Sequence, residues 1–358
     1  MARHLPRLLV CTLSRHRQTE GTAARRERRV MRLDVAYDSR RTSHMSVGMQ
    51  QYAFELQARM RRIAADLSFE TFGKGDNFDW GEQIAMPLWI RKAAPRLVHF
   101  PSPYAPTVVP APYVVTIHDL IDLHYPQWTK PNARWYYQVV VRRLARRARC
   151  VITDDDGTAD DIARFYGVAR ERVAVIPLGI EASGVRPAVH PRPYAIYAGN
   201  RRSHKDLPTL VEAWRRVDAA RPLDLVLTGE PDVQLADARR EGGRIVFLGN
   251  LEHGDVLRWI AGAAMLTHAA LREGFGLPLL EAAKLGTPVV ACGSAVPVPL
   301  REAVRTFPAG DAAAMTRAIE ETLDDRSGEL VRKARLVADA LTWDRCVQRT
   351  VEVYRRFL

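Results

Sequence analysis

The chain of 358 residues is long enough for two ordinary domains, which excludes a peptide hormone, a disulfide-stapled module and a single small binding domain. Its 47% hydrophobic and 26% charged residues are typical of a globular protein that folds in water, because a disordered chain is less apolar and a lipid-embedded chain carries fewer charges. Half of the formal net charge of +12 lies in residues 1–30, so the rest of the chain is only mildly basic.

Residues 1–30 contain eight arginines but no sustained hydrophobic period. Their apolar run, Leu8–Leu13, is too short for the core of a signal peptide and is too closely followed by Arg15 and Arg17. We interpret the segment as a disordered basic extension or as a start codon assigned too early, ahead of the strand-like run that opens at Met31. A basic arm that contacts anionic lipid or RNA is the alternative.

From residue 31 onward, short β-rich runs alternate with longer segments of helical period, the pattern of parallel sheets covered by helices on both faces. The first half predicts strands at Leu33–Tyr37, Leu67–Phe72, Leu97–Phe100, Tyr113–Ile117, Cys150–Thr153 and Arg172–Ile176. The helical patterns between these strands include Val47–Ala65, Asn132–Ala148 and Gly157–Tyr166. We expect one doubly wound domain over residues 31–178.

A stretch rich in Pro and Gly predicts a linker over residues 179–193. The alternation then restarts with strands predicted at Tyr194–Ala198, Leu223–Thr228, Arg244–Leu248, Ala264–His268 and Pro288–Ala291. The helices predicted after the linker are Asp206–Ala219, Pro278–Leu285 and three more from Asp311. A second doubly wound domain over residues 194–340 and a closing helix over residues 341–358 complete an α/β fold, with a cleft between the carboxyl ends of the two sheets.

The four cysteines lie far apart, without a CxxC pair, which indicates a reduced, cytoplasmic compartment. The longest stretch without Asp, Glu, Lys or Arg, Leu97–His118, contains five prolines and therefore cannot be a membrane-spanning helix. The predicted helix Asn132–Ala148 interleaves five arginines with Trp135 and neighbouring tyrosines. Such a face suits the inner surface of an anionic membrane, and a core helix with a solvated arginine side is the alternative.

The segment Leu271–Ala291 is the most informative for chemistry. A glycine-containing loop ends at Gly276, and a helix begins at about Leu277, so unpaired amides and the positive end of the helix dipole suit a phosphate. Glu273 and Glu281 are directed to the same side and can accept hydrogen bonds from the hydroxyls of a sugar and a ribose. The structural alternative is a pair of loop glycines followed by a solvated glutamate.

The letters EGFGLPLLE, from Glu273 to Glu281, resemble the E-x7-E signature of the retaining GT-B glycosyltransferases of family 4. Together with further matches, the resemblance covers nearly all of the chain from residue 31 to residue 358. It implies that Glu273 faces the donor sugar and that Glu281 binds the nucleotide ribose. It also implies contacts to sugar and diphosphate from the backbone amides of Phe275, Gly276 and Leu277.

The letters GNRRSHK resemble the family segment that opens the second domain, where a glycine and a basic pair hold the diphosphate. The resemblance implies this role for Gly199 and Lys205, and Asn200 stands at the usual arginine position. Either Arg201 or Arg202 then supplies the second cation in place of that arginine. A lysine before a helix is otherwise an ordinary solvated side chain.

Three other segments match the family. The letters TIHDL put His118 and Asp119 at a strand end, which implies that the histidine reaches the donor sugar, while the aspartate contacts the donor, orients the imidazole or caps the turn. SVGMQQYAFEL resembles the first strand-to-helix turn, where Gly48 admits phosphate or acceptor, and GNLEHGDV implies that the amide of Leu251 holds the nucleobase. The alternatives are that His118 has a structural role and that Gly48 only caps a helix.

The run from Asp154 to Asp156 replaces serines that are common in the family. Paired aspartates bind Mg²⁺ or Mn²⁺ in another glycosyltransferase architecture, but aspartates between a strand and a helix commonly cap the helix, which we favour. The family neutralises the diphosphate without a metal. We therefore expect no metal and no cofactor, with a nucleotide sugar as co-substrate.

The resemblance implies a metal-independent hexosyltransferase that retains anomeric configuration and acts on a glycan or lipid-linked acceptor in polysaccharide or glycolipid assembly. The letters GNRRSHK resemble family members that use GDP-mannose, so GDP-mannose is the donor that we expect. The alternatives are a sugar-nucleotide epimerase on the same fold and, from a different class, a basic nucleic-acid-binding protein. The sequence contains no recognition helix or RNA-binding motif, which argues against a nucleic-acid-binding protein, so we expect no nucleic-acid partner.

Overall fold

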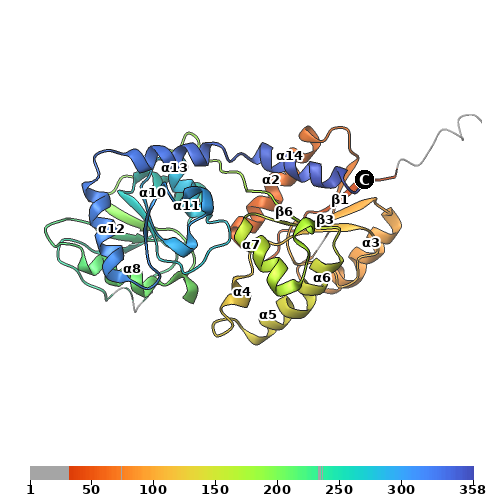
Figure 1. The fold of residues 1–358 in the computed structure, drawn as a ribbon, viewed down its shortest axis with the longest axis horizontal. Coiled ribbons are helices and arrows are strands. Elements are labelled where there is room, and N and C mark those ends of the chain that lie inside the picture. The colour runs from red at the N-terminus through yellow and green to blue at the C-terminus, as the bar shows by residue number, and fades with distance from the viewer. Residues whose placement is uncertain (1–31, 74, 233–234, 236) are drawn as a thin grey trace, which may run out of the picture.

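The computed structural model describes residues 32–73, 75–232, 235 and 237–358, so the predicted basic extension lies outside the described residues. The described chain forms two α/β domains that lie next to each other (Figure 1), each built around a parallel sheet. This arrangement confirms the predicted fold class of two doubly wound, Rossmann-like domains.

The strands of the N-terminal sheet are β1 (Val35–Asp38), β2 (Phe69–Phe72), β3 (Leu97–Phe100), β4 (Tyr113–Thr116), β5 (Cys150–Thr153) and β6 (Val173–Val175). They pair in parallel in the order β2-β1-β3-β4-β5-β6. Every residue of β1, β3, β4 and β5 is buried, as expected of strands covered on both faces. Because the chain reverses its direction of travel between β1 and β3, a crevice is expected at their carboxyl ends.

Helices cover both faces of this sheet. On one face, α2 (Val47–Ile63) packs with α14 (Trp343–Arg355), the last helix of the chain. The helical elements of the N-terminal domain other than α2 are η1 (Gly81–Ala85), α3 (Met86–Ala93), α4 (Ile121–His124), α5 (Pro131–Trp135), η2 (Tyr136–Val141), α6 (Arg142–Arg147), α7 (Asp156–Asp161), η3 (Ile162–Tyr166) and η4 (Arg170–Arg172). Each of the predicted helices Asn132–Ala148 and Gly157–Tyr166 contains a π-helical turn, formed by η2 and η3.

The C-terminal sheet contains β7 (Tyr194–Tyr197), β8 (Asp224–Leu227), β9 (Ile245–Phe247), β10 (Met265–His268), β11 (Val289–Cys292) and β12 (Arg305–Phe307). They pair in parallel in the order β12-β11-β10-β7-β8-β9, which is the dinucleotide-binding order. The helical elements of this domain are η5 (Ser203–Lys205), α8 (Leu207–Arg216), α10 (His253–Gly262), α11 (Leu277–Leu285), η6 (Gly293–Ala295), η7 (Val298–Leu300), α12 (Ala312–Asp324) and α13 (Glu329–Asp339). The switch point lies between β7 and β10, the two strands that precede the Lys205 and Glu273 segments.

The chain crosses between the domains twice. It leaves the first domain after β6 and returns after α13, and α14 then lies on α2 (Figure 1). The two crossings touch where the amide of Ile180 donates to the carbonyl oxygen of Leu341 at 3.1 Å. In α14, the hydroxyl of Tyr354 lies 2.6 Å from Nδ1 of buried His99 in β3, which ties the helix to the first sheet. Across the described residues, every helix falls short of the length and apolarity that crossing a bilayer requires.

Candidate active site

A pocket of about 600 Å³ lies between the two domains, at the carboxyl ends of both sheets. The N-terminal domain contributes the start of α2 and the turn after β4, while the C-terminal domain contributes the turns after β7, β8, β9 and β10. The structure brings these predicted site residues together in its lining: Gly48, His118, Asp119, Gly199, Arg201, Lys205, Leu251, Glu273, Phe275, Gly276, Leu277 and Glu281. Arg202 is the predicted site residue that lies outside the lining, with an exposed side chain.

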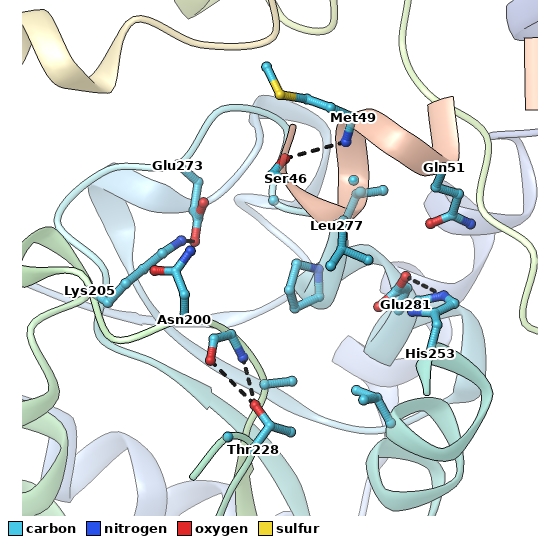
Figure 2. Close-up of a pocket in the computed structure, with 18 of the residues that line it drawn as sticks. Ser46, Met49, Gln51, Asn200, Lys205, Thr228, His253, Glu273, Leu277 and Glu281 are labelled. Carbon is cyan, nitrogen blue, oxygen red and sulfur yellow. Dashed lines mark hydrogen bonds and ion pairs between the residues drawn. The ribbon is translucent and has the colours of Figure 1, made fainter. Parts of the chain in front are cut away.

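Lys205 and Glu273 meet at one end of the pocket (Figure 2). The ammonium group of Lys205 donates to Oε1 of Glu273, and Nε2 of His268 lies 2.5 Å from the same oxygen. The side chains of Lys205 and Glu273 are about nine-tenths buried, and His268 at the end of β10 is 1% exposed. Lys205 is positioned by η5, which ends at Asp206 in a left-handed conformation with φ of 49°.

Glu273 is held as a carboxylate. Its burial alone would raise its pKa, but the charges and hydrogen bonds of His268 and Lys205 outweigh burial and hold the pKa at about 2. Lys205 has three ammonium hydrogens, so its contact with Glu273 leaves donors for a ligand. This end of the pocket therefore offers an anionic acceptor and a cationic donor side by side.

Arg201 contributes a cation whose charge is not neutralised by any described carboxylate within ion-pair distance. Its guanidinium lies over the ring of Phe247, with Cζ 5.1 Å from the ring centroid. Nη2 makes a long contact of 3.4 Å with the carbonyl oxygen of Thr228, and Nε is buried without a hydrogen-bond partner. The two arginines left open by the sequence thus differ, because Arg201 faces the pocket and Arg202 does not.

The start of α11 faces the middle of the pocket, where Figure 2 places Leu277. Gly276 caps this helix with φ of 72°, a left-handed conformation that glycine adopts without strain. Pro278 has no amide hydrogen, and the amides of Leu279 and Leu280 donate to the carbonyl oxygen of Gly276, so the amides of Gly276 and Leu277 are the ones that suit an anion here. The start of α2 lies opposite, because a Cβ added to Gly48 would be 2.9 Å from Cδ1 of Leu277.

Glu281 and His253 lie at the other end of the pocket (Figure 2). Nε2 of His253 is 3.3 Å from Oε1 of Glu281, and this nitrogen has no hydrogen-bond partner with acceptable geometry. Burial raises the pKa of Glu281 to about 8 and lowers the pKa of His253. Both groups are therefore neutral at neutral pH, and both can form hydrogen bonds with hydroxyl groups of a ligand.

His118 projects from the turn after β4 and is held on both ring nitrogens. Nδ1 lies 2.6 Å from Oδ2 of buried Asp154, and Nε2 lies 3.3 Å from the carbonyl oxygen of Pro101. Because a carbonyl oxygen can only accept, Nε2 carries a hydrogen. Burial opposes protonation of the ring, but the charge and hydrogen bond of Asp154 outweigh it and raise the pKa of His118. His118 is therefore a donor at the pocket wall.

The three aspartates after β5 have three different roles. Asp154 pairs with His118, Asp155 caps α7 by accepting from the amide of Thr158 at 3.1 Å, and exposed Asp156 pairs with Arg170 at 2.7 Å. The predicted capping role is thus confirmed for Asp155. Across the described ranges, no group of three or more His, Cys, Asp or Glu side chains is arranged to hold a metal ion.

Asp119, Gly199 and Leu251 contribute to the turns that line the pocket. Oδ1 of Asp119 accepts from the amide of Ile121 at 3.1 Å, which caps the turn into α4. The amide of Gly199 donates to the hydroxyl of Thr228 at 3.1 Å, and Leu251 lines the pocket just before α10.

The sequence reasoning missed His268 and the pairing of Asp154 with His118. A polar residue at the end of a buried strand, five positions before Glu273, was the available signal for His268. It also missed a contact between the domains, in which Nη2 of Arg272 lies 2.5 Å from Oδ2 of Asp161 in α7. That aspartate also accepts from Nε2 of His124 at 2.7 Å.

The raised pKa of Glu281 predicts a pH-dependent cost to stability. A carboxyl group that ionises at about pH 8 in the folded chain and near 4.5 when unfolded stabilises the fold below pH 4.5 and loses that contribution as the pH rises through 8. We expect Glu281→Gln, which cannot ionise, to become progressively more stable than the wild type between pH 5 and pH 8, by on the order of a few kcal/mol. Urea unfolding at several pH values measures the difference, and a constant difference would contradict the raised pKa.

The pairing of His118 with Asp154 predicts a protonation state. We expect both ring nitrogens of His118 to carry hydrogens at pH 6 in the wild type, and Asp154→Asn to lower its pKa because the amide brings no negative charge. Long-range ¹H–¹⁵N spectra of histidine-labelled protein measure this, with His118→Gln to assign the signal. A neutral His118 at pH 6 in the wild type would contradict it.

Two family profiles match the chain, one for each domain. The profile described as Glycosyltransferase Family 4 matches residues 54–184, and the profile described as Glycosyl transferases group 1 matches residues 192–325. The O-antigen chain mannosyltransferase B of Escherichia coli is 25% identical over 265 residues, which cover 68% of this chain and 70% of that protein. The MMP alpha-(1->4)-mannosyltransferase of Mycolicibacterium hassiacum is 29% identical over 248 residues, which cover 64% of this chain and 60% of that protein.

Among solved structures, Anabaena HepE in complex with UDP and glucose resembles the chain with a TM-score of 0.68 and 15% identity, covering 91% of this chain and 100% of that one. At 15% identity, this likeness shows a shared fold and nothing about function. The two matched ranges include the pocket residues of both domains except those at the start of α2. The chain belongs to the family 4 glycosyltransferases, which are transferase enzymes with the GT-B fold.

Proposed function

We propose that this chain moves a hexose, with mannose as the first candidate, from a nucleoside diphosphate sugar to a hydroxyl of a glycan or lipid-linked acceptor, with retention of anomeric configuration. One observation carries the proposal. In the pocket between the domains, the Lys205 ammonium contacts the Glu273 carboxylate while Arg201 remains without a described ion-pair partner. A ligand that brings two negative phosphates and a ring of hydroxyls complements that set of groups.

The diphosphate is proposed to lie between Arg201, Lys205 and the start of α11. Arg201 supplies a charge that a phosphate can pair with, and Lys205 supplies the ammonium hydrogens not used by Glu273. The amides at the start of α11 add partial positive charge without a side chain. These groups would neutralise the diphosphate without a metal, which is why we propose metal-independent transfer.

The two ends of the pocket are proposed to hold the two sugars of the donor. The ionised Glu273 would accept hydrogen bonds from hexose hydroxyls. His118 would donate to the same ring from the other domain through Nε2, in place of its long contact with the carbonyl oxygen of Pro101. Glu281 and His253 lie at the far end, where they would hold the ribose (Figure 2). The start of α11 lies between the two ends, next to the proposed position of the diphosphate.

In the proposed reaction, the bond between the anomeric carbon and the diphosphate oxygen breaks, and its electron pair goes to the leaving diphosphate. The acceptor hydroxyl bonds to the anomeric carbon from the same face and passes its proton to a diphosphate oxygen. Positive charge develops on the ring and negative charge on the leaving group. Fixed cations and amides therefore stabilise the transition state, with no enzymic nucleophile assigned.

Contacts between the domains beside the pocket would limit the access of water. Arg272 pairs with Asp161 across the cleft, and the ring of Tyr125 stacks on His204 with centroids 6.2 Å apart. Each contact adjoins a proposed site residue, because Arg272 precedes Glu273 and His204 precedes Lys205. Closure at these points would favour the acceptor hydroxyl over water as the attacking group.

The choice of mannose rests on the two mannosyltransferase relatives, named for that activity. GDP-mannose is accordingly the first donor to test, although HepE was solved with UDP and glucose. A panel of GDP and UDP sugars, monitored by thermal stabilisation and by slow hydrolysis of the donor, identifies the donor. We expect GDP-mannose to raise the melting temperature more than the other donors and to be hydrolysed, and stabilisation by none of the panel would contradict a nucleotide-sugar donor.

Substitutions in the pocket test the roles of its charges. We expect Glu273→Ala and Lys205→Ala each to lower transfer or donor hydrolysis by about 100-fold or more while the protein stays folded, because each removes a group that contacts the reacting donor. We expect Arg201→Ala to weaken donor binding and Arg202→Ala, its neighbour outside the pocket, to act as a matched control. Equal effects of the two arginine substitutions would contradict the placement of the diphosphate.

Removal of metal ions tests how the diphosphate is neutralised. We expect full activity in excess EDTA, because Arg201, Lys205 and the amides of α11 supply the positive charge. A strict requirement for added Mn²⁺ would overturn this part of the proposal, and the aspartates after β5 would then be the first candidates for the metal ligands.

A further inference from the structure

Exposed apolar side chains are concentrated in one part of the N-terminal domain. Among the described residues, eight of the thirteen exposed large hydrophobic side chains lie between residues 78 and 139. They are Phe78, Trp80, Ile84, Leu88, Val108, Trp128, Trp135 and Val139. Trp80 is 81% exposed, so an indole side chain that usually packs in a core or an interface lies in solvent here.

Five of these side chains follow the outer faces of two helices. In the continuous helix η1–α3, Trp80, Ile84 and Leu88 recur every four residues on the exposed side, while Met86 and Ile90 pack into the core. The helix α5–η2–α6 repeats this pattern: Trp135 and Val139 are exposed, whereas Tyr137, Val141 and Leu144 are buried. Each helix therefore has an apolar stripe in addition to the one that the core requires.

The two helices share one side of the domain. Their buried residues belong to the same hydrophobic cluster, which contains Val98 and Val115 of the first sheet. The other face of that sheet is covered by α2 and α14, and Figure 1 shows α3, α5 and α6 on the side away from them. The rings of Phe78 and Tyr136 meet edge to face with centroids 5.0 Å apart, which connects the start of one helix to the other.

The exposed charge of residues 78–149 is strongly one-sided. Within residues 78–149, all of which the structure describes, nine cationic residues are exposed and no Asp or Glu is. The cations are Arg91, Lys92, Lys130, Arg134, Arg142, Arg143, Arg146, Arg147 and Arg149. None of the nine forms an ion pair with a described carboxylate. We call the exposed faces of η1–α3 and α5–η2–α6, with these cations, the basic apolar surface.

We propose that the basic apolar surface binds the face of a membrane that contains anionic lipids, with the aromatic and aliphatic side chains entering the headgroup region and the arginines contacting lipid phosphates. Charge complementarity favours this occupant, because nine exposed cations without a described ion-pair partner attract an anionic surface. The exposed tryptophans and aliphatic side chains select a bilayer rather than a nucleic acid, whose backbone offers no apolar phase for them. The proposal stands whether or not the proposed sugar transfer is correct.

The orientation of the surface connects it to the pocket. Trp80 lies at the start of η1–α3, and Trp135 lies at the end of α5, about one turn into α5–η2–α6. The hydroxyl of Tyr136 donates at 3.0 Å to the carbonyl oxygen of Pro103, in the loop after β3. The starts of both helices therefore lie at the carboxyl edge of the sheet, which is also the edge that faces the pocket. A bilayer bound there would adjoin the cleft, so an acceptor anchored in lipid could enter it directly.

Vesicle sedimentation of the full chain tests the proposal, with equimolar phosphatidylglycerol and phosphatidylcholine compared with phosphatidylcholine alone. We expect binding to the anionic vesicles that weakens with salt. We expect Arg142→Glu with Arg146→Glu to lower the partition coefficient about tenfold or more. Trp80→Ser with Leu88→Ser is expected to lower it by a similar factor and to reduce the binding that remains at high salt.

Matched variants on the other domain control for total charge and exposed apolar area. Arg215→Glu with Arg317→Glu changes the charge equally, and Leu336→Ser removes an exposed leucine that is 72% accessible. All variants keep residues 1–30, so the arginines of that segment contribute equally throughout. Circular dichroism confirms that each variant is folded. Equal loss in the test and control variants, absence of binding to anionic vesicles, or tighter binding of a 20-nucleotide RNA that needs the same arginines would overturn the proposal.

Discussion

The ion pair of Lys205 with Glu273 depends on the order of strands in the C-terminal sheet. The two residues are 68 positions apart, and they meet because β7 and β10 are neighbours at the switch point of the sheet. There the lysine is buried against a carboxylate that His268 also holds ionised. A buried pair of this kind persists only when its geometry and hydrogen bonds offset desolvation, so the surrounding turns must be rigid.

Much of this arrangement could be predicted from the sequence. The alternation of short buried strands with helical segments predicts parallel sheets, and the glycine before Leu277 predicts a helix start that faces a ligand. The strand β12 and helices α3 and α10 were not among the elements predicted by residue range, because short edge strands and segments of mixed period carry weak patterns. The π-helical turns also have no periodic signature of their own.

Side-chain pairing is what the sequence could not predict. Asp154 looked like one of three capping residues, and only the fold places its carboxylate 2.6 Å from a histidine 36 positions earlier. The choice between Arg201 and Arg202 depends on which neighbour points to Phe247, which no spacing rule determines. The apolar residues around Trp80 gave no periodic signal to separate a core stripe from an exposed one, since η1–α3 carries both.

A structure of the protein with a bound nucleoside diphosphate tests most directly where the ligand's charge is neutralised. We expect the two phosphates to lie within hydrogen-bond distance of Arg201, Lys205 and the first amides of α11, with the ribose next to Glu281. A diphosphate bound away from these groups, or held there through a metal on the aspartates after β5, would contradict the assignment of the pocket.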